Sequence, residues 1–346
     1  MTMLELQDIH VHYRPARKLL SPAVEPVKAL NGVTFSLDSG RSMGLVGESG
    51  SGKSTLARAI LRLTDIQAGT ITFDGLDITQ LDKKALLSFR KDVQGVLQDP
   101  YSSLNPLHDV SVIVGDPITR HLGIKKGAQR NQRIIELLTV VGLSGDFLHR
   151  KPHQMSGGQR QRVSLARALA VEPKLIVADE ATSALDVSIQ SHIVNLLRRV
   201  QKEKQVALLF IAHNLEVVKH IATDVGVMYL GYLVEVGKTE TLYASPTHPY
   251  TEMLLASIPV PNPKQQAQRK ALRQSFIDAE PASPSNLPPG CPFANRCPVA
   301  MDVCKEEMPE LTKTASGFAR CHLHTSGPNL GGETVIDYIK GSSNQL

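Results

Sequence analysis

Apolar and polar residues alternate near the start of the chain, as they do in a half-buried β-strand. Residues 4–13 (LELQDIHVHY) have this alternation, and strand character returns at 30–37, 42–46 and 68–73. Residues 14–28 are basic and contain proline, which favours a loop. An apolar helix at about 53–63 follows the strand at 42–46 through a Gly-rich segment. The first region therefore mixes antiparallel strands with a strand–loop–helix unit.

Short, wholly apolar segments alternate with helical patterns in the middle of the chain. Residues 175–178 (LIVA) and 207–212 (ALLFIA) are typical of strands buried on both faces, as in a parallel sheet. Residues 188–201 between them carry apolar side chains at helical spacing, and residues 105–170 have a mostly helical pattern. This alternation of strands and helices predicts a doubly wound α/β core.

The regular pattern ends near residue 259. Residues 259–290 are rich in Pro, Gln and Ser, which predicts a linker with one short helix near 265–277. A cysteine-rich segment follows at 291–325, and the polar residues 326–346 predict a loose tail. We therefore expect one large domain at 1–258, with a helical subdomain at about 99–168, then a linker and a small C-terminal module.

Composition narrows the class of protein. Of 346 residues 42% are hydrophobic, which is enough for a sizeable core. Trp is absent and aromatic residues make up 4%, so modules that stack on single-stranded nucleic acid are not expected. The net charge of +5 is compatible with binding of nucleotide, lipid headgroups or nucleic acid, and it does not distinguish between these ligands. Without a long apolar run or a signal peptide, we expect a cytosolic chain, and any transport pore would have to lie in other polypeptides.

The Gly-rich segment at 47–55 (GESGSGKST) has the spacing of a phosphate-binding loop. Its glycines let the backbone wrap around phosphate oxygens, and successive N–H groups at a helix start attract anions. Lys53 is expected to reach the β- and γ-phosphates, and the Ser54 hydroxyl to bind magnesium. The alternative is an incidental turn that caps a helix. The predicted nucleotide residues of this loop are Gly47, Ser49, Gly50, Ser51, Gly52, Lys53, Ser54 and Thr55.

Acidic residues end the buried strand at 175–178. Asp179 is expected to hold the magnesium shell, and Glu180 to act as general base toward the attacking water. His213 follows the next buried strand and is a candidate for contact with the γ-phosphate. Taken alone, an acidic pair at a strand end is often a solvated surface feature, and a lone histidine is often structural. Their shared position after buried strands favours the functional interpretation.

A second anion-binding surface is predicted at Ser156–Gln159. Ser156, Gly157 and Gly158 precede a helical run, so a hydroxyl and free N–H groups lie at a helix start. One nucleotide seldom needs two such cradles from one chain, so the second is expected to serve the nucleotide of an opposing subunit. As an isolated string, it is also what a well-capped helix looks like.

Together these motifs resemble the ATPase family of ABC transporters over about residues 4–258. The resemblance identifies 47–55 as Walker A, 175–179 as Walker B, Glu180 as the catalytic glutamate and Ser156–Gln159 as the signature. It also implies roles for residues that spacing alone does not single out. Gln98 would be the Q-loop glutamine, and it would bind magnesium together with Ser54 and Asp179. Asp186 would belong to the D-loop at 183–186. His213 would be the switch histidine, and Tyr13 the aromatic residue that stacks on adenine.

The implied fold is a RecA-like P-loop NTPase core with an antiparallel β-subdomain, a helical subdomain and a small C-terminal Cys-rich module. The segments QDPYSSLNP at 98–106, MYLGYLVEVG at 228–237 and PPGCPFANRCP near the C-terminus are similar to the oligopeptide/dipeptide/nickel importer ATPases. That resemblance implies ATP and Mg²⁺ as cofactors and peptide uptake as the function, with nickel or another small solute as the alternative.

The same resemblance implies partners and a location. They are a second, homologous ATPase chain, two transmembrane permease subunits and an external substrate-binding protein, with this chain peripheral on the cytoplasmic face of the membrane. A non-transport ABC ATPase is less favoured, because DNA-repair types insert long coiled coils that this chain lacks. A non-hydrolysing regulatory subunit is disfavoured by the intact Glu180 and His213.

All four cysteines lie in the last 60 or so residues, at Cys291, Cys297, Cys304 and Cys321. Clustered thiols in a reducing compartment point to metal or iron–sulfur ligation before disulfides. The close CxxC pairs of zinc ribbons are absent, and loosely spaced thiols suit a cubane cluster. The family resemblance also points to a 4Fe–4S site. Zinc and unliganded or disulfide-bonded cysteines remain alternatives.

Overall fold

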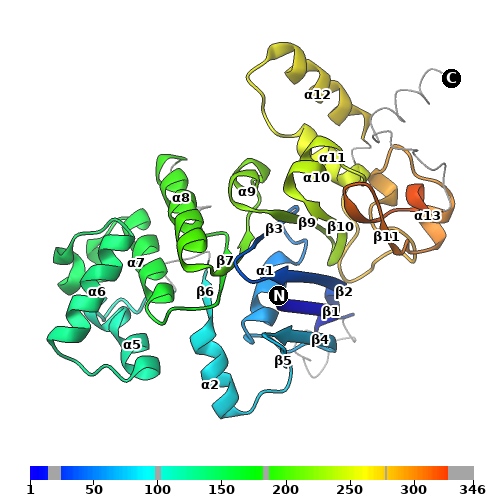
Figure 1. Ribbon diagram of the computed structural model, residues 1–346. Helices are drawn as coiled ribbons and strands as arrows, with labels where there is room; N and C mark the ends of the chain where they lie inside the picture. Colours follow the sequence, from blue (N-terminus) through cyan, green and yellow to red (C-terminus); the bar gives the residue numbers. More distant parts are fainter. Residues whose placement is uncertain (15–24, 98–102, 182–186, 277–278, 326–346) are drawn as a thin grey trace, which may run out of the picture.

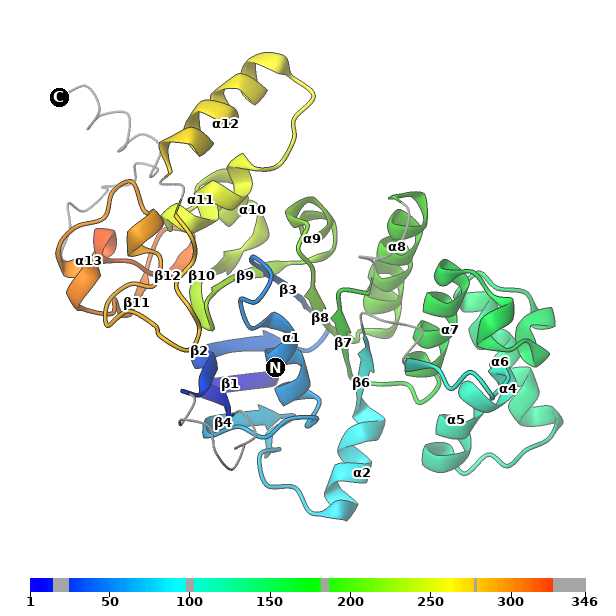
Figure 2. The same ribbon diagram turned by 180° about the vertical axis from the view of Figure 1, so that it is seen from behind.

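The computed structural model describes residues 1–14, 25–97, 103–181, 187–276 and 279–325. Two sheets form its centre, with a helical region on one side and the C-terminal segments on the other (Figure 1). The view from behind has the same order of parts, with the helices α4–α7 at one end and β11 and α13 at the other (Figure 2). Within the described ranges, no helix combines the length and the apolar character that crossing a bilayer requires.

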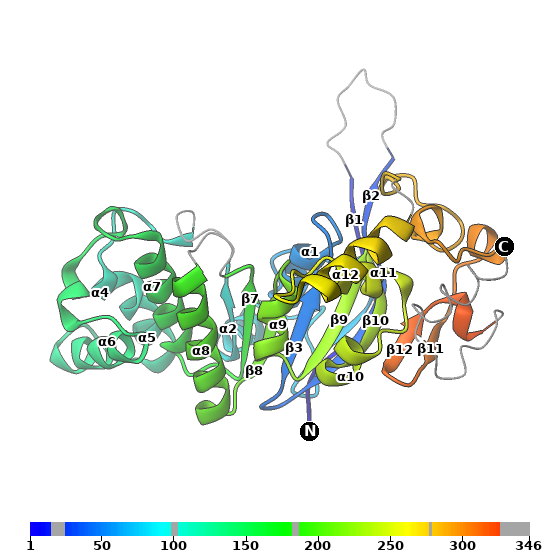
Figure 3. The ribbon, with the colours of Figure 1, turned by 90° about the horizontal axis from the view of Figure 1, so that it is seen from above.

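An antiparallel sheet contains the N-terminus. Its strands lie in the order β2-β1-β4-β5, and they are β1 (Thr2–Tyr13), β2 (Val27–Asp38), β4 (Ala68–Phe73) and β5 (Leu76–Asp77). β1 alternates buried and exposed positions because only one of its faces meets the core. The long β1–β2 pair projects from the body of the molecule when it is viewed from above (Figure 3).

The larger sheet has the order β11-β12-β10-β9-β3-β8-β7-β6. Its central part is parallel and consists of β9 (Asp224–Tyr229), β3 (Ser42–Val46), β8 (Ala207–Ile211), β7 (Leu175–Asp179) and β6 (Val93–Val96). Every residue of β3, β7 and β8 is buried, which explains why their sequences are apolar apart from Ser42 at the start of β3 and Asp179 at the end of β7. The antiparallel strands at the other end are β10 (Tyr232–Lys238), β12 (Gly317–Arg320) and β11 (Leu311–Lys313).

Helices lie on both sides of this sheet and beyond its β6 edge. Near the phosphate loop and β6 lie α1 (Lys53–Ile60) and α2 (Lys83–Asp92). The helical region contains α4 (Val110–Ile113), α5 (Gly115–Leu122), α6 (Ala128–Val140), the short η1 (Gly145–His149) and η2 (Pro152–Gln154), and α7 (Gly157–Leu169). The remaining helices are α8 (Val187–Lys204), α9 (Leu215–Ile221), α10 (Thr239–Ala244), α11 (Pro249–Ala256), α12 (Pro263–Ser275), η3 (Ala294–Arg296), α13 (Val303–Glu306) and η4 (His322–His324).

Two hydrophobic clusters occupy the two faces of the large sheet. One joins α1 and the antiparallel sheet to Leu175 and Val177 of β7. The other joins the helical region, α8 and the C-terminal segments to Ile176 and Ala178 of the same strand. Because successive strand residues point to opposite faces, β7 contributes to both clusters in alternation. α1 contacts β7 on one side and β2 on the other, so the phosphate loop is anchored between the two sheets.

The apolar pattern of the sequence located the central elements well. β3 has the predicted bounds, and β7, α8 and β8 differ from prediction by a few residues at most. The sequence pattern did not predict that β12 pairs with β10 at Glu235, Val236 and Gly237, or that β11 then pairs with β12 and extends the large sheet further. The domain boundaries drawn at residues 258 and 290 stay a prediction.

The C-terminal segment is attached to the core through Phe293. Its ring is 1% exposed and lies 5.3 Å from the rings of both Tyr229 and Tyr250, centroid to centroid. His248 and Phe276 complete this aromatic cluster, at 6.1 and 6.4 Å from Phe293. Such ring pairs add to the free energy gained from burial alone. Phe293 is therefore an apolar anchor between the cysteine-rich segment and the core around β9 and α11.

Replacing this anchor should destabilise the protein. We expect Phe293→Ala to lower the free energy of unfolding by about 3–5 kcal/mol, because the lost ring leaves a cavity among Tyr229, Tyr250 and Phe276. Urea denaturation followed by circular dichroism measures this. Phe318→Ala is the matched control, because that ring is 45% exposed and should change stability by about 0.5 kcal/mol at most. Equal losses in the two variants would contradict the anchoring role.

Candidate nucleotide-binding site

Three adjacent parallel strands end at the same edge of the large sheet. β3 pairs with β8, and β8 pairs with β7, so their carboxyl ends face the same way. The phosphate loop follows β3, Asp179 and Glu180 end β7, and His213 comes two residues after β8. In open α/β sheets this edge is where ligands bind. The topology therefore brings together segments that are more than 120 residues apart in sequence.

Close backbone packing requires glycine at two positions of the phosphate loop. A Cβ atom at Gly47, whose φ is 149°, would lie 2.1 Å from the carbonyl oxygen of Met228. At Gly52, the N-cap of α1 with φ 100°, a Cβ atom would lie 2.5 Å from the carbonyl oxygen of Ala29. Both contacts are far inside van der Waals distance, and positive φ disfavours other residues. The loop is thus wrapped tightly between β9 and β2.

Lys53 lies folded into the loop that it is expected to serve. Its Nζ donates to the carbonyl oxygens of Gly47 and Glu48, at 2.8 Å each, and to Ser51 Oγ at 3.0 Å. Burial lowers the pKa of Lys53, and the nearby carboxylates of Glu180, Asp179 and Glu48 oppose that shift. A buried ammonium group at the first residue of a helix makes this a strongly anion-attracting position.

Ser54 and Asp179 meet directly across the site. Ser54 Oγ donates to Asp179 Oδ1 at 3.1 Å, and Asp179 is 5% exposed. Burial raises the pKa of Asp179, while the hydrogen bond from Ser54 lowers it. A hydroxyl and a carboxylate held side by side are hard oxygen ligands of the kind that Mg²⁺ prefers. The residue pair therefore fits the predicted magnesium site.

Glu180 and His213 lie at neighbouring strand ends. Glu180 is half-buried and has a left-handed backbone with φ 45°, and its N–H donates to the Ile211 carbonyl oxygen at 2.9 Å. Residues other than glycine pay a conformational cost in this region, and such positions concentrate at functional sites. His213 is exposed. The structure thus brings both predicted catalytic side chains to the edge that holds the phosphate loop.

Tyr13 ends β1 and is 38% exposed. It pairs with Val27 of β2, two residues before Ala29, whose carbonyl group touches Gly52. Tyr13, the predicted adenine-stacking residue, therefore lies beside the part of β2 that contacts the phosphate loop, and it is accessible to solvent. Its role as a stacking partner stays a prediction.

The signature segment lies in the helical region, apart from α1 in all three views (Figures 1, 2 and 3). Ser156 caps α7: its Oγ accepts from the Gln159 N–H, and its own N–H donates to Gln159 Oε1 at 3.0 Å. Gly157 begins the helix, and Gly158 allows close packing, because a Cβ there would lie 2.8 Å from Ile189. The cap leaves Ser156 exposed on the surface, where a second molecule has access to it.

Two predicted site residues are not part of the described structure. Gln98 and Asp186 lie outside the described ranges, together with the rest of the D-loop at 183–186. The structure does describe the remaining predicted loop residues. Ser49 and Gly50 are exposed, Ser51 is buried, and Thr55 lies in the first turn of α1.

Sequence reasoning missed two residues that hold the phosphate loop from outside. The Glu48 N–H donates to Tyr250 Oη at 2.8 Å, and the Glu48 carboxylate pairs with Arg296 at 2.9 and 3.1 Å. These partners are 202 and 248 residues away along the chain. No local motif or period reports such contacts, so only the tertiary structure reveals them.

The four cysteines line one small pocket together with His248 and Phe293. They are free thiols, and burial raises the pKa of Cys291 to about 11 and that of Cys297 to about 12. The pocket has a volume of about 10 Å³, roughly that of one water-sized probe. Among the described residues no group of three or more His, Cys, Asp or Glu is placed to hold a metal ion. The structure brings the predicted thiols together but does not support the 4Fe–4S site, which stays a prediction that iron and sulfide analysis would test.

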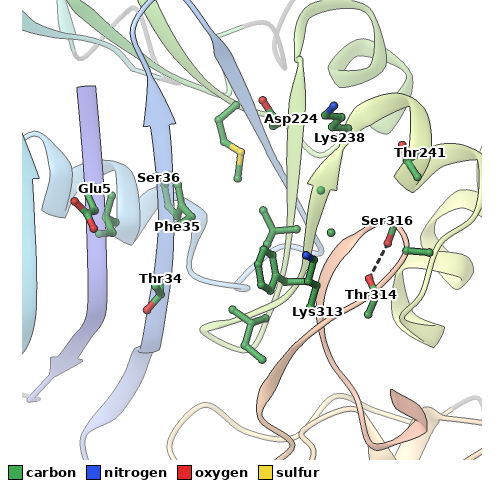
Figure 4. Close-up of a pocket in the computed structure, with 18 residues that line it drawn as sticks. Glu5, Thr34, Phe35, Ser36, Asp224, Lys238, Thr241, Lys313, Thr314 and Ser316 are labelled. Atoms are coloured by element: carbon green, nitrogen blue, oxygen red, sulfur yellow. Dashed lines mark hydrogen bonds between the residues drawn. The ribbon is translucent and has the colours of Figure 1, made fainter. Parts of the chain in front are cut away.

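Another cavity lies away from the phosphate loop. It has a volume of about 730 Å³ and opens between β2, β10 and the β11–β12 hairpin (Figure 4). Its lining carries the dispersed charges of Glu5, Asp224, Lys238 and Lys313. None of its described lining residues belongs to the predicted nucleotide site, so the cavity is separate from the phosphate loop.

Comparison with known proteins places the chain in a family. The ABC transporter family matches residues 30–183, and the C-terminal region of oligopeptide/dipeptide transporters matches residues 234–304. The oligopeptide transport ATP-binding protein AppF of Bacillus subtilis is 45% identical over 326 residues, or 94% of this chain and 98% of AppF. The oligopeptide transport ATP-binding protein OppF of Salmonella typhimurium is 41% identical over 312 residues, or 89% of this chain and 92% of OppF.

Solved structures agree with the fold. A dimeric, post-hydrolysis structure of the ATP-binding cassette MJ0796 with ADP and Pi matches with a TM-score of 0.61 and 29% identity, covering 68% of this chain and 99% of that one. CbiO1 of Clostridium perfringens matches with a TM-score of 0.58 at 24% identity, covering 70% of this chain and 91% of that one, which supports the fold alone. The chain therefore belongs to the ABC transporter family and, within it, to the oligopeptide/dipeptide transport ATP-binding proteins.

Proposed function

We propose that this chain binds and hydrolyses ATP as a subunit of an ABC importer that takes up di- and oligopeptides. The contact between Ser54 and Asp179 carries the proposal, because it joins the phosphate loop to the acidic end of β7. The match of residues 234–304 to the oligopeptide/dipeptide transporter C-terminal region supports peptides as the cargo. So do AppF and OppF, which are named for oligopeptide transport. Nickel or another small solute is the alternative cargo.

Magnesium fits the site through Ser54 and Asp179, with Gln98 as a further proposed ligand. Bound there, the ion would neutralise negative charge on the phosphates. The residues of this chain supply the rest of the anion site. Lys53 exchanges its contacts with loop carbonyls for the phosphates, and the N–H groups at the start of α1 hold the remaining oxygens.

Glu180 is proposed as the general base. Its carboxylate orients a water molecule toward the γ-phosphorus and takes the proton as the P–O bond to ADP breaks, so that ADP and phosphate leave. The left-handed backbone of Glu180 fixes where its side chain starts, one residue after the magnesium ligand Asp179. His213, from the adjacent strand end, is proposed to contact the γ-phosphate.

The exposed signature segment supports a shared site between two subunits. Ser156 and the N–H groups at the start of α7 form an anion-binding helix end that lies in the helical region, away from α1. We therefore propose that two ATPase chains meet head to tail and enclose each ATP between one Walker loop and the other Ser-Gly-Gly turn. The dimeric MJ0796 structure with ADP and Pi supports this arrangement by analogy. The second chain is proposed to be a homologue of this one.

We propose that a groove beside β6 is the docking site for a permease subunit. It has a volume of about 680 Å³ and is lined by α2, β6 and α5. Leu63 at its rim is 56% exposed, while Arg90 and Arg120 make it basic. A short amphipathic helix with an acidic face fits such a lining. The full assembly is proposed to contain two permease subunits and an external binding protein, with this chain on the cytoplasmic face of the membrane.

Removing the Lys53 side chain should weaken nucleotide binding. We expect Lys53→Ala to weaken Mg–ATP binding by roughly tenfold or more, because charge-assisted contacts to the phosphates are lost. Isothermal titration calorimetry of the full chain measures this. Lys174→Ala is the control, since Lys174 forms a surface ion pair with Asp74. Unchanged Mg–ATP affinity in Lys53→Ala would contradict the assignment of this loop as the phosphate-binding site.

Removing the base should separate binding from turnover. We expect Glu180→Gln to retain ATP binding but to lower the rate of hydrolysis by about a hundredfold or more, and to accumulate an ATP-bound closed dimer. Phosphate release and size-exclusion chromatography with Mg–ATP measure the two effects. Glu203→Gln, on the exposed face of α8, should turn over as the wild type does. Wild-type turnover in Glu180→Gln would rule out Glu180 as the base.

The proposed docking groove predicts that a charge reversal there weakens binding to the permease subunits without changing nucleotide binding. Arg120→Glu should leave Mg–ATP affinity of the isolated chain unchanged while weakening co-purification with the membrane subunits. The reason is that it reverses a charge in the groove without touching the phosphate loop. Arg133→Glu, on α6, is the control because Arg133 lines a different cavity of the helical region. Equal recovery of membrane subunits with both variants would argue against this docking site.

A further inference from the structure

A carboxylate stands within the phosphate loop, where it ought to repel the ligand. Glu48 lies between Gly47 and Ser49, and its backbone carbonyl oxygen accepts a hydrogen bond from Lys53 Nζ at 2.8 Å, so its side chain starts beside that ammonium group. A phosphate cradle depends on a positive local field. A free carboxylate at this point would compete with the triphosphate for Lys53. The site therefore needs a means of keeping the Glu48 side chain occupied.

Arg296 provides that means from the cysteine-rich segment. Its Nη1 lies 2.9 Å from Glu48 Oε2, and its Nη2 lies 3.1 Å from Glu48 Oε1. Two parallel N–H···O bonds of this kind hold the carboxylate in one orientation and compensate its negative charge. A single contact from a lysine would not fix the orientation. The side chains of Arg296 and Glu48 are 14% and 34% exposed, so solvent screens the pair only in part.

The guanidinium group is itself held in place by the core. Nη1 lies 3.4 Å from Tyr229 Oη, and the guanidinium carbon lies 5.9 and 5.7 Å from the ring centroids of Tyr229 and Phe293. Burial lowers the pKa of Arg296, but the hydrogen bonds to Glu48 and Tyr229 outweigh it, so the net shift is upward. Arg296 thus stays charged and has little freedom to leave Glu48.

The backbone around Arg296 is also constrained. Arg296 ends the short helix η3, and its N–H donates to the carbonyl oxygen of Phe293, the buried aromatic anchor. Cys291 begins this segment, with its N–H donating to the Cys304 carbonyl oxygen at 2.7 Å. The C-terminal segment therefore presents Arg296 to the phosphate loop from a fixed frame.

We propose that Arg296 is a positioning residue for ATP binding: it holds the Glu48 carboxylate off the anion site, so that Lys53 is free to meet the phosphates. This inference rests on the proposed ATP-binding function and adds to it a role for the C-terminal segment. The segment completes the nucleotide site from outside the ATPase core.

A double-mutant cycle between Arg296 and Glu48 tests the idea. We expect Arg296→Gln to raise the Kd and the KM for Mg–ATP by about tenfold, with kcat changed far less, because an unpaired charge is left beside the phosphates. Glu48→Gln should bind Mg–ATP at least as tightly as the wild type, and Glu48→Gln/Arg296→Gln should match Glu48→Gln. Arg296→Lys should fall between the wild type and Arg296→Gln, because it keeps the charge but loses the paired contact.

The outcomes separate this inference from the proposed function. Arg133→Gln is the matched control, since it breaks an Arg–Glu pair of 2.9 Å to Glu172, and its Kd should equal that of the wild type. A wild-type chain that binds no Mg–ATP overturns both the function and the inference. Wild-type affinity in Arg296→Gln overturns the inference alone.

Two further results would also count against Arg296 acting through Glu48. One is a double variant as weak as Arg296→Gln, which would mean that lost packing rather than the exposed carboxylate weakens binding. The other is a Glu48→Gln variant that binds more weakly than the wild type. The second result decides the matter even if Arg296→Gln fails to fold, because Glu48→Gln leaves the C-terminal segment intact.

Discussion

A single hydroxyl–carboxylate contact, between Ser54 and Asp179, joins the two halves of the nucleotide site. It exists because β3 and β7 both pair with β8 in parallel, so that their polar ends emerge at one edge of the sheet. Burial raises the pKa of Asp179 and lowers that of Lys53, which shows that both charges are held at a cost in solvation. A magnesium–nucleotide complex carries the complementary charges, so its proposed binding here would offset that cost.

Residues far from the phosphate loop in sequence hold its conformation. Gly47 and Gly52 allow backbone contact with β9 and β2, which lie on opposite sides of the loop. Tyr250 accepts the N–H of Glu48, and Arg296 binds its carboxylate. The region that matches the oligopeptide/dipeptide transporter C-terminal family includes both of these residues. The C-terminal segment is therefore structurally continuous with the candidate nucleotide site, whereas the cavity of about 730 Å³ at the β11–β12 hairpin shares no lining residue with the phosphate loop.

The sequence predicted the central strands and the phosphate loop because both are local features. A wholly apolar run such as residues 175–178 has few alternatives to a buried strand, and a Gly-rich loop between strand and helix has few alternatives to an anion site. The placement of β11 and β12 beside β10 was not predictable, since it depends on pairing across some 80 residues with no periodic signal. The Glu48–Arg296 pair was hidden for the same reason. The cysteine spacing predicted a shared thiol pocket, but spacing does not report its volume.

The magnesium dependence of ATP binding in Asp179→Asn tests the central claim most directly. An amide at this position keeps the size of the side chain and its hydrogen bond with Ser54, but it removes the charge that would hold the ion. Calorimetric titration of wild type and variant with ATP, with and without Mg²⁺, gives the comparison. We predict that Mg²⁺ strengthens ATP binding to the wild type and has little effect on Asp179→Asn. The same gain from Mg²⁺ in both proteins would contradict the assignment of this strand end as the magnesium–nucleotide site.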